Sequence, residues 1–372
     1  MDRKFLPHYY NLLVQKERAY YLICKEIHAE WSDDADLEQL WEIHDRHARV
    51  FKSLIKEPAT DNRVITGKTN GGSEPGDKIT GRNLLDLKIE IAGRMLSSCV
   101  FCENKCKVDR YSDNLGICGI SADATVYSAF LHHGEEPPLV PSGTIFFAGC
   151  TFNCVFCQNW DISSVGKNIA SGSGISGKSG GNPVDERDLA LEADRLVNGG
   201  AKNINYVGGD PTPNLHVIIG SLTYQSQNIC QLWNSNFYNT IQALKLLVDV
   251  MDFWLPDFKY GNNECGEKFS LVKNYWDILT RNLKFIYDWG SRDICIRHLV
   301  MPGHFKCCTK PILEWIAIEI PGVVVNIMAQ YRPEYKVNST DFPEINRRVT
   351  REEMASAFAL ADELGIEYRI VS

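Results

Sequence analysis

The sequence contains no uninterrupted apolar stretch of the length that a membrane-spanning helix requires. Its charged start, Met1 to Lys4, is not followed by the apolar segment of a secretion signal. We therefore expect a cytoplasmic protein without a membrane partner. Because disulfides are rare in the cytoplasm, the 13 cysteines are better interpreted as metal ligands and buried thiols than as a disulfide framework.

The sequence also lacks a block of basic residues and an internal repeat. Lys and Arg total 39 against 47 Asp and Glu, which gives a net charge of −8. Because a surface that binds nucleic acid is normally basic, we expect no DNA or RNA partner. The apolar share of 44% is typical of a globular protein, and 372 residues suffice for a large domain with an accessory segment.

Composition divides the chain into three segments. Residues 1–85 combine apolar residues at helical spacing with a polar, glycine-containing stretch over 59–82, which predicts a helical extension and a linker. Residues 86–140 are rich in cysteine and predict a metal-binding segment. Residues 141–372 alternate short β-rich runs with helical segments and form the third predicted domain.

The alternation in the third segment predicts a parallel sheet with crossover helices. The six β-rich runs are 144–148, 203–207, 229–233, 251–258, 293–300 and 323–328. Six strands are too few for a closed eight-stranded barrel. We therefore expect an α/β fold with a partial (β/α)6 TIM-like barrel, whose functional loops follow the strands.

Local signals add detail to this outline. Apolar spacing predicts a helix over 185–198, and a capping box at Thr350 predicts another that ends near Leu364. A short final strand is expected within 366–371. The glycine- and serine-rich stretch 171–181 is interpreted as a mobile loop.

Cys150, Cys154 and Cys157 follow the first β-rich run in C-x3-C-x2-C order. Three thiolates on one short loop can each bind a different iron of a 4Fe-4S cubane, which normally takes four protein ligands. The fourth iron is then open to a substrate or cofactor. The alternatives are a zinc site completed by a distant ligand, or core cysteines grouped by coincidence. Zinc sites more often use C-x2-C pairs, so we prefer the cluster.

This loop, with Phe156 before its third cysteine and the run Cys157 to Ser163 after it, resembles the radical S-adenosylmethionine superfamily. Within it, the run is similar to the pyruvate formate-lyase activating enzyme-like branch. The similarity covers the chain from the cysteine-rich segment to the C-terminus. It implies that the three cysteines are catalytic, because their cluster would bind S-adenosylmethionine and cleave it reductively to a 5'-deoxyadenosyl radical. It also implies a low-potential electron donor of flavodoxin or ferredoxin type.

The resemblance implies further cofactor contacts at the ends of the strands. Gly208, Gly209 and Asp210 stand where the superfamily usually has Gly-Gly-Glu, and they would hold the methionyl ammonium. The other predicted cofactor-binding residues are Phe156, Asn234, Asn236, Asp257, Lys259, Arg297 and Gln330. Without the resemblance, the Gly-Gly-Asp run is a turn before a helix. Asp257 and Lys259 would then form only an ion pair on one face of a strand.

Two positions depart from the activating-enzyme pattern. Gln158 stands where those enzymes have a histidine after the third cysteine. Gln330 lies in a run where they have a histidine-containing segment. These departures leave a protein, a peptide and a small molecule open as the substrate.

A second group, Cys99, Cys102, Cys106 and Cys118, offers four thiols before the predicted barrel. Four converging thiolates close a site, which suits structural zinc and equally a second 4Fe-4S cluster that relays electrons. The remaining cysteines are interpreted as four isolated buried thiols and one vicinal pair without an assigned role. They are Cys24, Cys230, Cys265, Cys295 and the pair Cys307-Cys308.

The preferred hypothesis is a radical enzyme that abstracts hydrogen from an unidentified substrate, for which a glycyl-radical-type protein partner or a peptide is a candidate. The alternative from another class is a non-catalytic iron–sulfur or zinc protein that transfers electrons or assembles clusters. A radical enzyme that modifies RNA is a third hypothesis, which the acidic composition disfavours.

Overall fold

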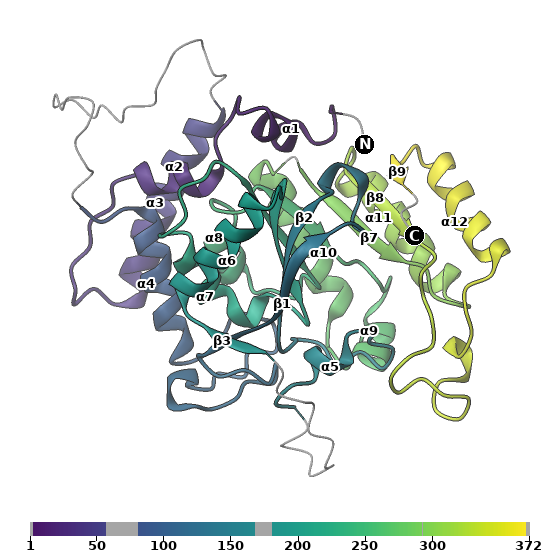
Figure 1. Cartoon of the computed structure of the whole chain (residues 1–372). Helices are drawn as coiled ribbons and strands as arrows, with labels where there is room; N and C mark the ends of the chain where they lie inside the picture. Colours follow the sequence, from purple (N-terminus) through teal and green to yellow (C-terminus); the bar gives the residue numbers. More distant parts are fainter. Residues whose placement is uncertain (1–2, 57–80, 168–180, 292, 370–372) are drawn as a thin grey trace.

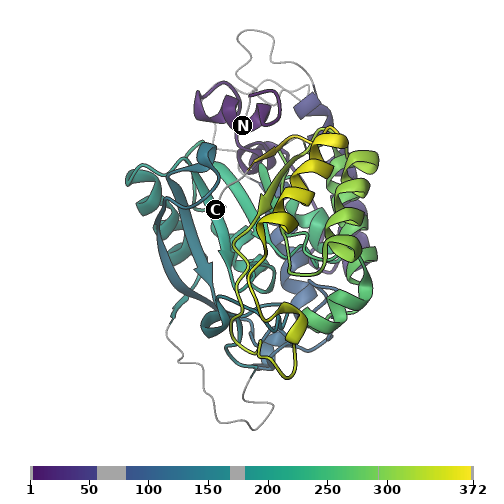
Figure 2. The same ribbon diagram turned by 90° about the vertical axis from the view of Figure 1, so that its right-hand side faces the viewer.

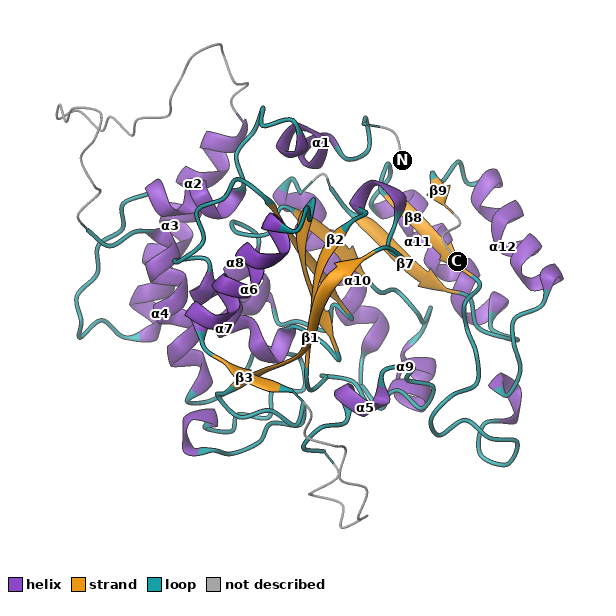
Figure 3. Ribbon diagram, viewed as in Figure 1, coloured by secondary structure: helices purple, strands orange, loops and turns teal. Residues whose placement is uncertain are grey.

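Six parallel strands form the centre of the protein, and helices flank them (Figures 1 and 3). The computed structural model describes residues 3–56, 81–167, 181–291 and 293–369. The predicted linker over 59–82 and the predicted loop over 171–181 lie almost wholly outside the described residues and stay predictions.

The parallel strands follow one another in chain order, the first four in a six-stranded sheet and the last two in a three-stranded sheet. They are β2 (Ser142–Phe147), β4 (Asn203–Gly208), β5 (Cys230–Ser235), β6 (Phe253–Pro256), β7 (Cys295–Leu299) and β8 (Val324–Met328). Parallel bridges from Trp254 to Ile294 and from Asp257 to Arg297 join β6 to β7. Each predicted β-rich run overlaps one of these strands, so the α/β partial barrel of six parallel strands is confirmed.

Short strands extend the sheet at both ends. At one end, β1 (Ala124–His132) pairs antiparallel with β2, and β3 (Asn182–Val184) pairs antiparallel with β1. At the other end, β9 (Tyr368–Arg369) pairs parallel with β8, inside the range where a final strand is predicted. The strand β1 falls in the cysteine-rich segment, where no strand is predicted.

The helices occupy the crossovers between the strands and the N-terminal segment. Along the chain they are α1 (Pro7–Leu13), α2 (Tyr20–Glu26), α3 (Leu37–Lys56), α4 (Leu84–Leu96), α5 (Trp160–Ser163), α6 (Glu186–Asn198), α7 (Leu215–Ser221), α8 (Ile241–Leu247), α9 (Asn263–Ser270), α10 (Tyr275–Trp289), α11 (Lys310–Glu319) and α12 (Arg351–Glu363). Five short turns complete the described elements. They are the 3-10 turns Arg110–Ser112, Pro137–Leu139, Thr212–Asn214 and Pro343–Ile345, and the π-helical turn Phe305–Thr309.

Local capping explains where two predicted helices begin. The Asp185 side chain accepts hydrogen bonds from the first turn of α6, and Thr350 forms a capping box with Glu353 at the start of α12. Both helices lie where the sequence predicts them. Among the described helices, none has both the length and the hydropathy needed to cross a bilayer.

The N-terminal helices pack on the barrel. The two described parts of the first predicted segment contribute to the same buried core as the strands. Inside α4, the buried Lys88 side chain forms an ion pair of 2.9 Å with Asp249, which follows α8. The predicted boundary at residue 85 falls in the first turn of α4, and the division into three domains stays a prediction.

Helix α1 covers the end of the barrel at which the strands begin (Figures 1 and 2). The His8 ring contacts Asp252, before β6, at 2.9 Å, and Glu17 at 2.5 Å. The backbone amide of Tyr9 donates to the carboxylate of Asp293, before β7. Burial alone would lower the pKa of His8, but the hydrogen bonds to Asp252 and Glu17 raise it to about 10. The charged imidazole therefore ties α1 to the barrel.

Replacing His8 by phenylalanine is expected to lower the free energy of unfolding by about 2 kcal/mol at pH 6. Because the folded-state pKa of His8 lies above its unfolded value of 6.5, this contribution is complete below pH 6.5 and is lost as the pH rises through about 10. Urea denaturation of wild type and His8→Phe at pH 6 and pH 10 measures it. An equal difference at both pH values would contradict a charged His8.

Candidate metal centre

The loop that carries Cys150, Cys154 and Cys157 begins at the end of β2 and lies between two other segments. The amide of Cys150 donates to the carbonyl of Cys118 at 3.2 Å. The amides of Asn153 and Val155 donate to the last residues of α9, Ser270 and Phe269, at 3.0 and 2.9 Å. Figure 1 shows α5 and α9 together at the end of the sheet opposite α1. Backbone hydrogen bonds thus fix the loop at the end of the strands.

Each of the three thiols has a hydrogen-bond partner. The Sγ atom of Cys150 accepts from the Phe152 amide at 3.4 Å and from the Asn236 side chain at 3.7 Å. The Sγ atom of Cys154 lies 2.9 Å from the Ser270 hydroxyl, and that of Cys157 lies 3.2 Å from the Ser163 hydroxyl. Donors of this kind stabilise the thiolates that a metal cluster requires.

The spacing of these thiols suits a cluster better than a single ion. Within the described ranges, only Cys265, Cys307 and Cys308 form a group of three or more metal-binding side chains whose ligand atoms all lie within 4.8 Å of one another. The sulfur atoms of the predicted triplet are therefore more widely spread. A cubane binds each thiolate through a different iron and accommodates that spread. Burial raises the pKa of Cys154 to about 11, so binding must displace protons.

Gly208 and Gly209 at the end of β4 pack directly against β2 and the cysteine loop. A Cβ atom on Gly208, whose φ is +131°, would lie 2.2 Å from the Phe147 nitrogen. A Cβ atom on Gly209 would lie 2.0 Å from the carbonyl oxygen of Gly149. Both positions therefore require glycine for packing. Their predicted contact with a cofactor stays a prediction.

Asp210 lies buried beside the loop with one free carboxylate oxygen. Its Oδ2 accepts from Thr151 at 2.9 Å, and the Thr151 hydroxyl accepts from Asn236 at 2.7 Å. Its Oδ1 is buried and accepts no hydrogen bond of good geometry, although Thr212 and the Asn236 backbone lie close enough to lower the pKa of the carboxyl group. Burial raises the pKa of Asp210 to about 6. A buried anionic oxygen without a partner fits an ammonium group.

Asn234 at the end of β5 offers the complementary group. Its side-chain nitrogen is buried and has no hydrogen-bond partner, so it fits an acceptor such as a carboxylate. The strands β4 and β5 are neighbours. An unpaired acceptor on Asp210 and an unpaired donor on Asn234 together suit the amino and carboxylate groups of S-adenosylmethionine.

Asp257 and Lys259 form the ion pair that the strand geometry predicts, with 2.6 Å between the charged groups. Burial opposes the charge on Lys259, but attraction to Asp257, Cys154 and Cys150 raises its pKa. The pair therefore lies near the cysteine loop. Its predicted contact with the cofactor stays a prediction.

Arg297, in the middle of β7, is held inside the barrel by two carboxylates. It contacts Glu136 through two hydrogen bonds of 2.9 and 2.8 Å, and it also pairs with Glu135. Asn326 on β8 donates to Glu136 at 2.9 Å, and Asn205 on β4 donates to Glu135 at 3.0 Å. This buried network links β4, β7 and β8. The contact of Arg297 with a cofactor stays a prediction, because its charge is already paired.

The two departures from the activating-enzyme pattern meet in space. The Gln158 side chain donates to the Gln330 carbonyl at 3.3 Å. The buried ring of Phe156 packs edge-on against Tyr331, with 5.4 Å between ring centres. The region after β8 thus lies next to the last part of the cysteine loop.

The second group of cysteines surrounds a small cavity next to the loop. Cys99, Cys102, Cys106 and Cys118 line it together with Arg110 and Thr151. A Cβ atom on Gly116 would lie 3.0 Å from the Cys118 sulfur and 3.5 Å from the Cys106 sulfur, so glycine leaves space for both thiols. The four thiols therefore share one cavity, although among the described residues no three of their sulfur atoms all lie within 4.8 Å of one another. The geometry leaves zinc and a second cluster open.

Arg110 places a buried positive charge at this second group. Its guanidinium lies 3.7 Å from the Cys99 sulfur and donates to the carbonyls of Ser121 and Pro213 at 2.9 and 2.7 Å. Interaction with the Cys99 thiol lowers the pKa of Cys106. A buried guanidinium offsets the negative charge that bound thiolates carry.

Sequence reasoning did not find several side chains of the site. The cysteines or Asp210 are contacted by Ser163 at the end of α5, Ser270 at the end of α9, Thr151 in the cysteine loop itself and Arg110 in a 3-10 turn, and no spacing pattern marks these residues. The interpretation of Cys265 as an isolated thiol is wrong, because it lies beside Cys307 and Cys308.

Comparison with known sequences gives two findings. The family model "Radical SAM superfamily" matches residues 144–316. The uncharacterized protein MJ0674 of Methanocaldococcus jannaschii is 42% identical over 351 residues, which cover 94% of each chain. That alignment therefore includes most of residues 1–85.

Among solved structures, the likeness is weaker. A domain of a pyruvate-formate lyase-activating enzyme from Bacteroides vulgatus is 14% identical, with a TM-score of 0.39 over 46% of this chain and 100% of that chain. A radical SAM methyltransferase from Sphaerobacter thermophilus is 11% identical, with a TM-score of 0.45 over 63% of this chain and 67% of that chain.

Proposed function

Because the chain belongs to the radical SAM superfamily, we propose that it is an enzyme that holds a 4Fe-4S cluster on Cys150, Cys154 and Cys157. When bound, the cluster supplies the electron that cleaves S-adenosylmethionine to a 5'-deoxyadenosyl radical, which abstracts hydrogen from a substrate. The observation that carries the proposal is the combination of three separated, hydrogen-bonded thiols with a buried unpaired carboxylate oxygen beside them.

The side chains around the loop have distinct tasks in this proposal. Asp210 accepts from the ammonium of S-adenosylmethionine through Oδ1, and the hydrogen bond from Thr151 to Oδ2 keeps its carboxylate in position. Asn234 donates to the carboxylate of the same ligand. Asn236 donates to both Thr151 and Cys150, so it couples the ligand-binding side of the site to the thiolates.

The second group of cysteines is proposed to serve the same site. The Cys118 carbonyl accepts from the Cys150 amide, and Thr151 lines the cavity between the four thiols. This adjacency supports an electron relay if the group holds a 4Fe-4S cluster, and a rigid platform if it holds zinc. Electrons would come from a flavodoxin- or ferredoxin-type donor.

For the substrate, we propose a protein or peptide of the glycyl-radical type. The run Cys157 to Ser163 supports this class through its similarity to the activating-enzyme branch. Gln158 and Gln330, the two residues that differ from that branch, contact each other. The identity of the substrate is therefore expected to differ from that of the activating enzymes even if its class is the same.

Cleavage of S-adenosylmethionine tests the enzymatic proposal against the alternative of a non-catalytic metal protein. Anaerobically reconstituted wild type, reduced with dithionite, is expected to form 5'-deoxyadenosine and methionine. Cys150→Ala is expected to form neither above background, because the loop loses one cluster ligand. Formation of no more 5'-deoxyadenosine by wild type than by Cys150→Ala would favour the non-catalytic alternative.

A second measurement tests the substrate class. An anaerobic extract of the source cells is separated into macromolecules and small molecules, and each fraction is added to the wild-type reaction. We expect only the macromolecular fraction to raise the rate of 5'-deoxyadenosine formation, and protease treatment to remove the effect. Stimulation by the small-molecule fraction alone would contradict a protein or peptide substrate.

A further inference from the structure

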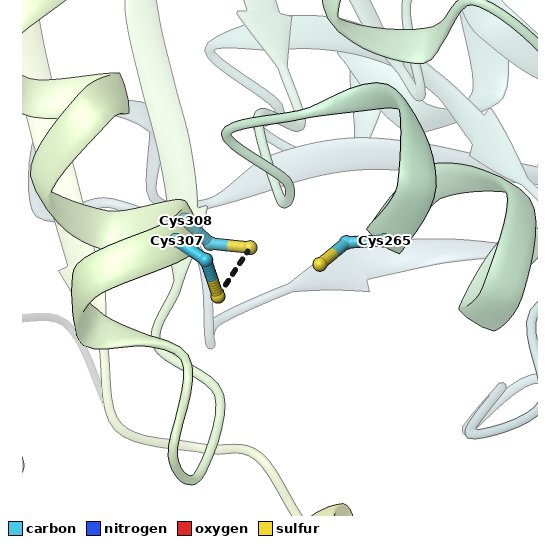
Figure 4. Close-up of side chains that lie close together, drawn as sticks. All are labelled: Cys265, Cys307 and Cys308. Carbon is cyan, nitrogen blue, oxygen red and sulfur yellow. Dashed lines mark hydrogen bonds between the residues drawn. The ribbon is translucent and has the colours of Figure 1, made fainter.

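Three cysteines outside the cluster loop gather where the segments after β6 and β7 meet. Cys265 lies on α9, whereas Cys307 and Cys308 lie in the π-helical turn Phe305–Thr309. Their three sulfur atoms all lie within 4.8 Å of one another. Figure 4 shows the Cys265 sulfur pointing toward the two sulfurs of the vicinal pair. The arrangement unites residues that are some forty positions apart in the chain.

This spacing is that of ligands on one ion. Two thiolates on a tetrahedral zinc with bonds of about 2.3 Å lie roughly 3.8 Å apart. The sulfurs of Cys307 and Cys308 lie 3.8 Å apart. A cubane would spread its thiolates over different irons, so the tight grouping favours a single ion. Soft thiolate ligands select zinc over magnesium or calcium.

His304 stands next to the three thiols in the form that a metal ligand takes. Its Nδ1 atom donates to the Pro302 carbonyl at 2.6 Å, which leaves the Nε2 atom with a free lone pair. A backbone carbonyl on the other ring nitrogen is the usual arrangement for a histidine that binds a metal. The His304 carbonyl accepts from the Cys308 amide at 2.9 Å, so the residue adjoins the thiols. Its ring nitrogens lie outside the 4.8 Å group of the three sulfurs, so the ring has to shift toward them to share an ion.

The surrounding backbone holds the two segments together before any ion binds. The Asn262 side chain donates to the Cys307 carbonyl at 2.8 Å and accepts from the Cys265 amide at 2.7 Å. A Cβ atom on Gly261 would lie 2.7 Å from the carbonyl oxygens of Cys307 and Cys308. This close approach, which only glycine permits, presents the ligands already near one another. Cys307 is exposed and gives an ion access from solvent.

From this geometry we infer a zinc site formed by the thiolates of Cys265, Cys307 and Cys308, with His304 as the fourth ligand. The site is separate from both predicted cysteine groups and does not depend on the proposed radical chemistry. Its four ligands fill a tetrahedral shell, so its task is structural. It fastens α9 to the turn after β7.

The zinc site affects the cluster loop because that loop packs on α9. The carbonyls of Phe269 and Ser270, at the end of α9, accept from the amides of Val155 and Asn153 in the cluster loop. The Ser270 hydroxyl contacts the Cys154 sulfur. Zinc at Cys265 therefore secures the helix on which the cluster loop rests, from a position outside the cluster.

Metal analysis of the full chain tests this site. Wild type, Cys265→Ala and Cys308→Ala are purified with zinc present, freed of loose metal, and analysed for zinc and iron. We expect both variants to hold one zinc per chain less than wild type with unchanged iron. The matched control, Cys24→Ala, removes a buried thiol far from the site in sequence and is expected to match wild type. Equal zinc in all four proteins would overturn the inference.

Two further measurements complete the test, and the first uses only wild type, so it does not depend on the folding of a variant. Cys307 of wild type is expected to react slowly with iodoacetamide when zinc is bound and rapidly after a chelator removes it, as read by peptide mass spectrometry. Equal reactivity in both states, or a disulfide among the three cysteines, would overturn the site. His304→Ala is expected to bind zinc at least about tenfold more weakly than wild type. Unchanged affinity would overturn the four-ligand set.

Discussion

Asp210→Asn is expected to weaken the binding of S-adenosylmethionine to the reconstituted protein by about 100-fold, while the iron content stays that of wild type. Asparagine keeps the shape and the acceptor for Thr151 but removes the negative charge that would pair with the ammonium. A hydrogen bond between charged groups contributes up to about 3 kcal/mol, which corresponds to that loss of affinity. Isothermal titration of the anaerobic protein with the ligand measures it.

The same carboxylate predicts a pH dependence. Burial raises the pKa of Asp210 to about 6 in the ligand-free protein, so the group loses its charge as the pH falls below 6. Affinity for S-adenosylmethionine is therefore expected to fall by up to about tenfold per pH unit below pH 6 in wild type, and to stay flat in Asp210→Asn. Asp123→Asn, which changes an exposed carboxylate, is the control. Parallel pH profiles of wild type and Asp210→Asn would contradict the assignment.

Arg297→Met is expected to lower the free energy of unfolding by about 3–5 kcal/mol, because it leaves two buried carboxylates without their cation. Urea denaturation of the metal-free chain measures this loss without any cofactor. Arg348→Met, which changes an exposed arginine, is the matched control and should leave stability within about 0.5 kcal/mol of wild type.

The loss should depend on pH in a defined direction. Burial alone would raise the pKa of Glu135, but the charge of Arg297, the nearby His132 ring and the hydrogen bond from Arg297 lower it to about 2. A carboxyl with a lowered folded-state pKa stabilises above its unfolded value of 4.5 and loses that contribution as the pH falls toward 2. The difference between wild type and Arg297→Met should shrink over that range. If Arg297→Met is as stable as wild type at pH 7, Arg297 does not stabilise the fold by neutralising these carboxylates.

The parallel strands could be predicted from the sequence because their physical signal is local. Parallel strands buried on both faces read as short continuous apolar runs, and β4, β5 and β8 consist almost wholly of buried residues. The strand β1 gives no such signal. It is only partly buried along its length, because it lies near the antiparallel end of the sheet.

In the candidate site, too, residues that are close in the sequence could be predicted and residues that are distant in the sequence could not. Cysteine ligands that share one loop can be recognised from their spacing in the sequence, as Cys150, Cys154 and Cys157 can. Partners from distant elements cannot: Ser270, at the end of α9, reaches Cys154 across 116 positions. The zinc ligands Cys265 and Cys307 lie on separate elements, so only the folded chain brings them together. The charge of Arg297 was visible in the sequence, but its two partners in the loop before β2 were not.

The central claim is that the three thiols of the loop after β2 hold a cluster with one iron open to S-adenosylmethionine. Electron paramagnetic resonance of the dithionite-reduced, reconstituted protein tests it directly, with and without the nucleotide. We predict a reduced 4Fe-4S signal that changes shape and g-values when S-adenosylmethionine is added. The variant Cys150→Ala is expected to show no such signal. A signal that the nucleotide leaves unaltered, or a loop that holds only zinc, would contradict the claim.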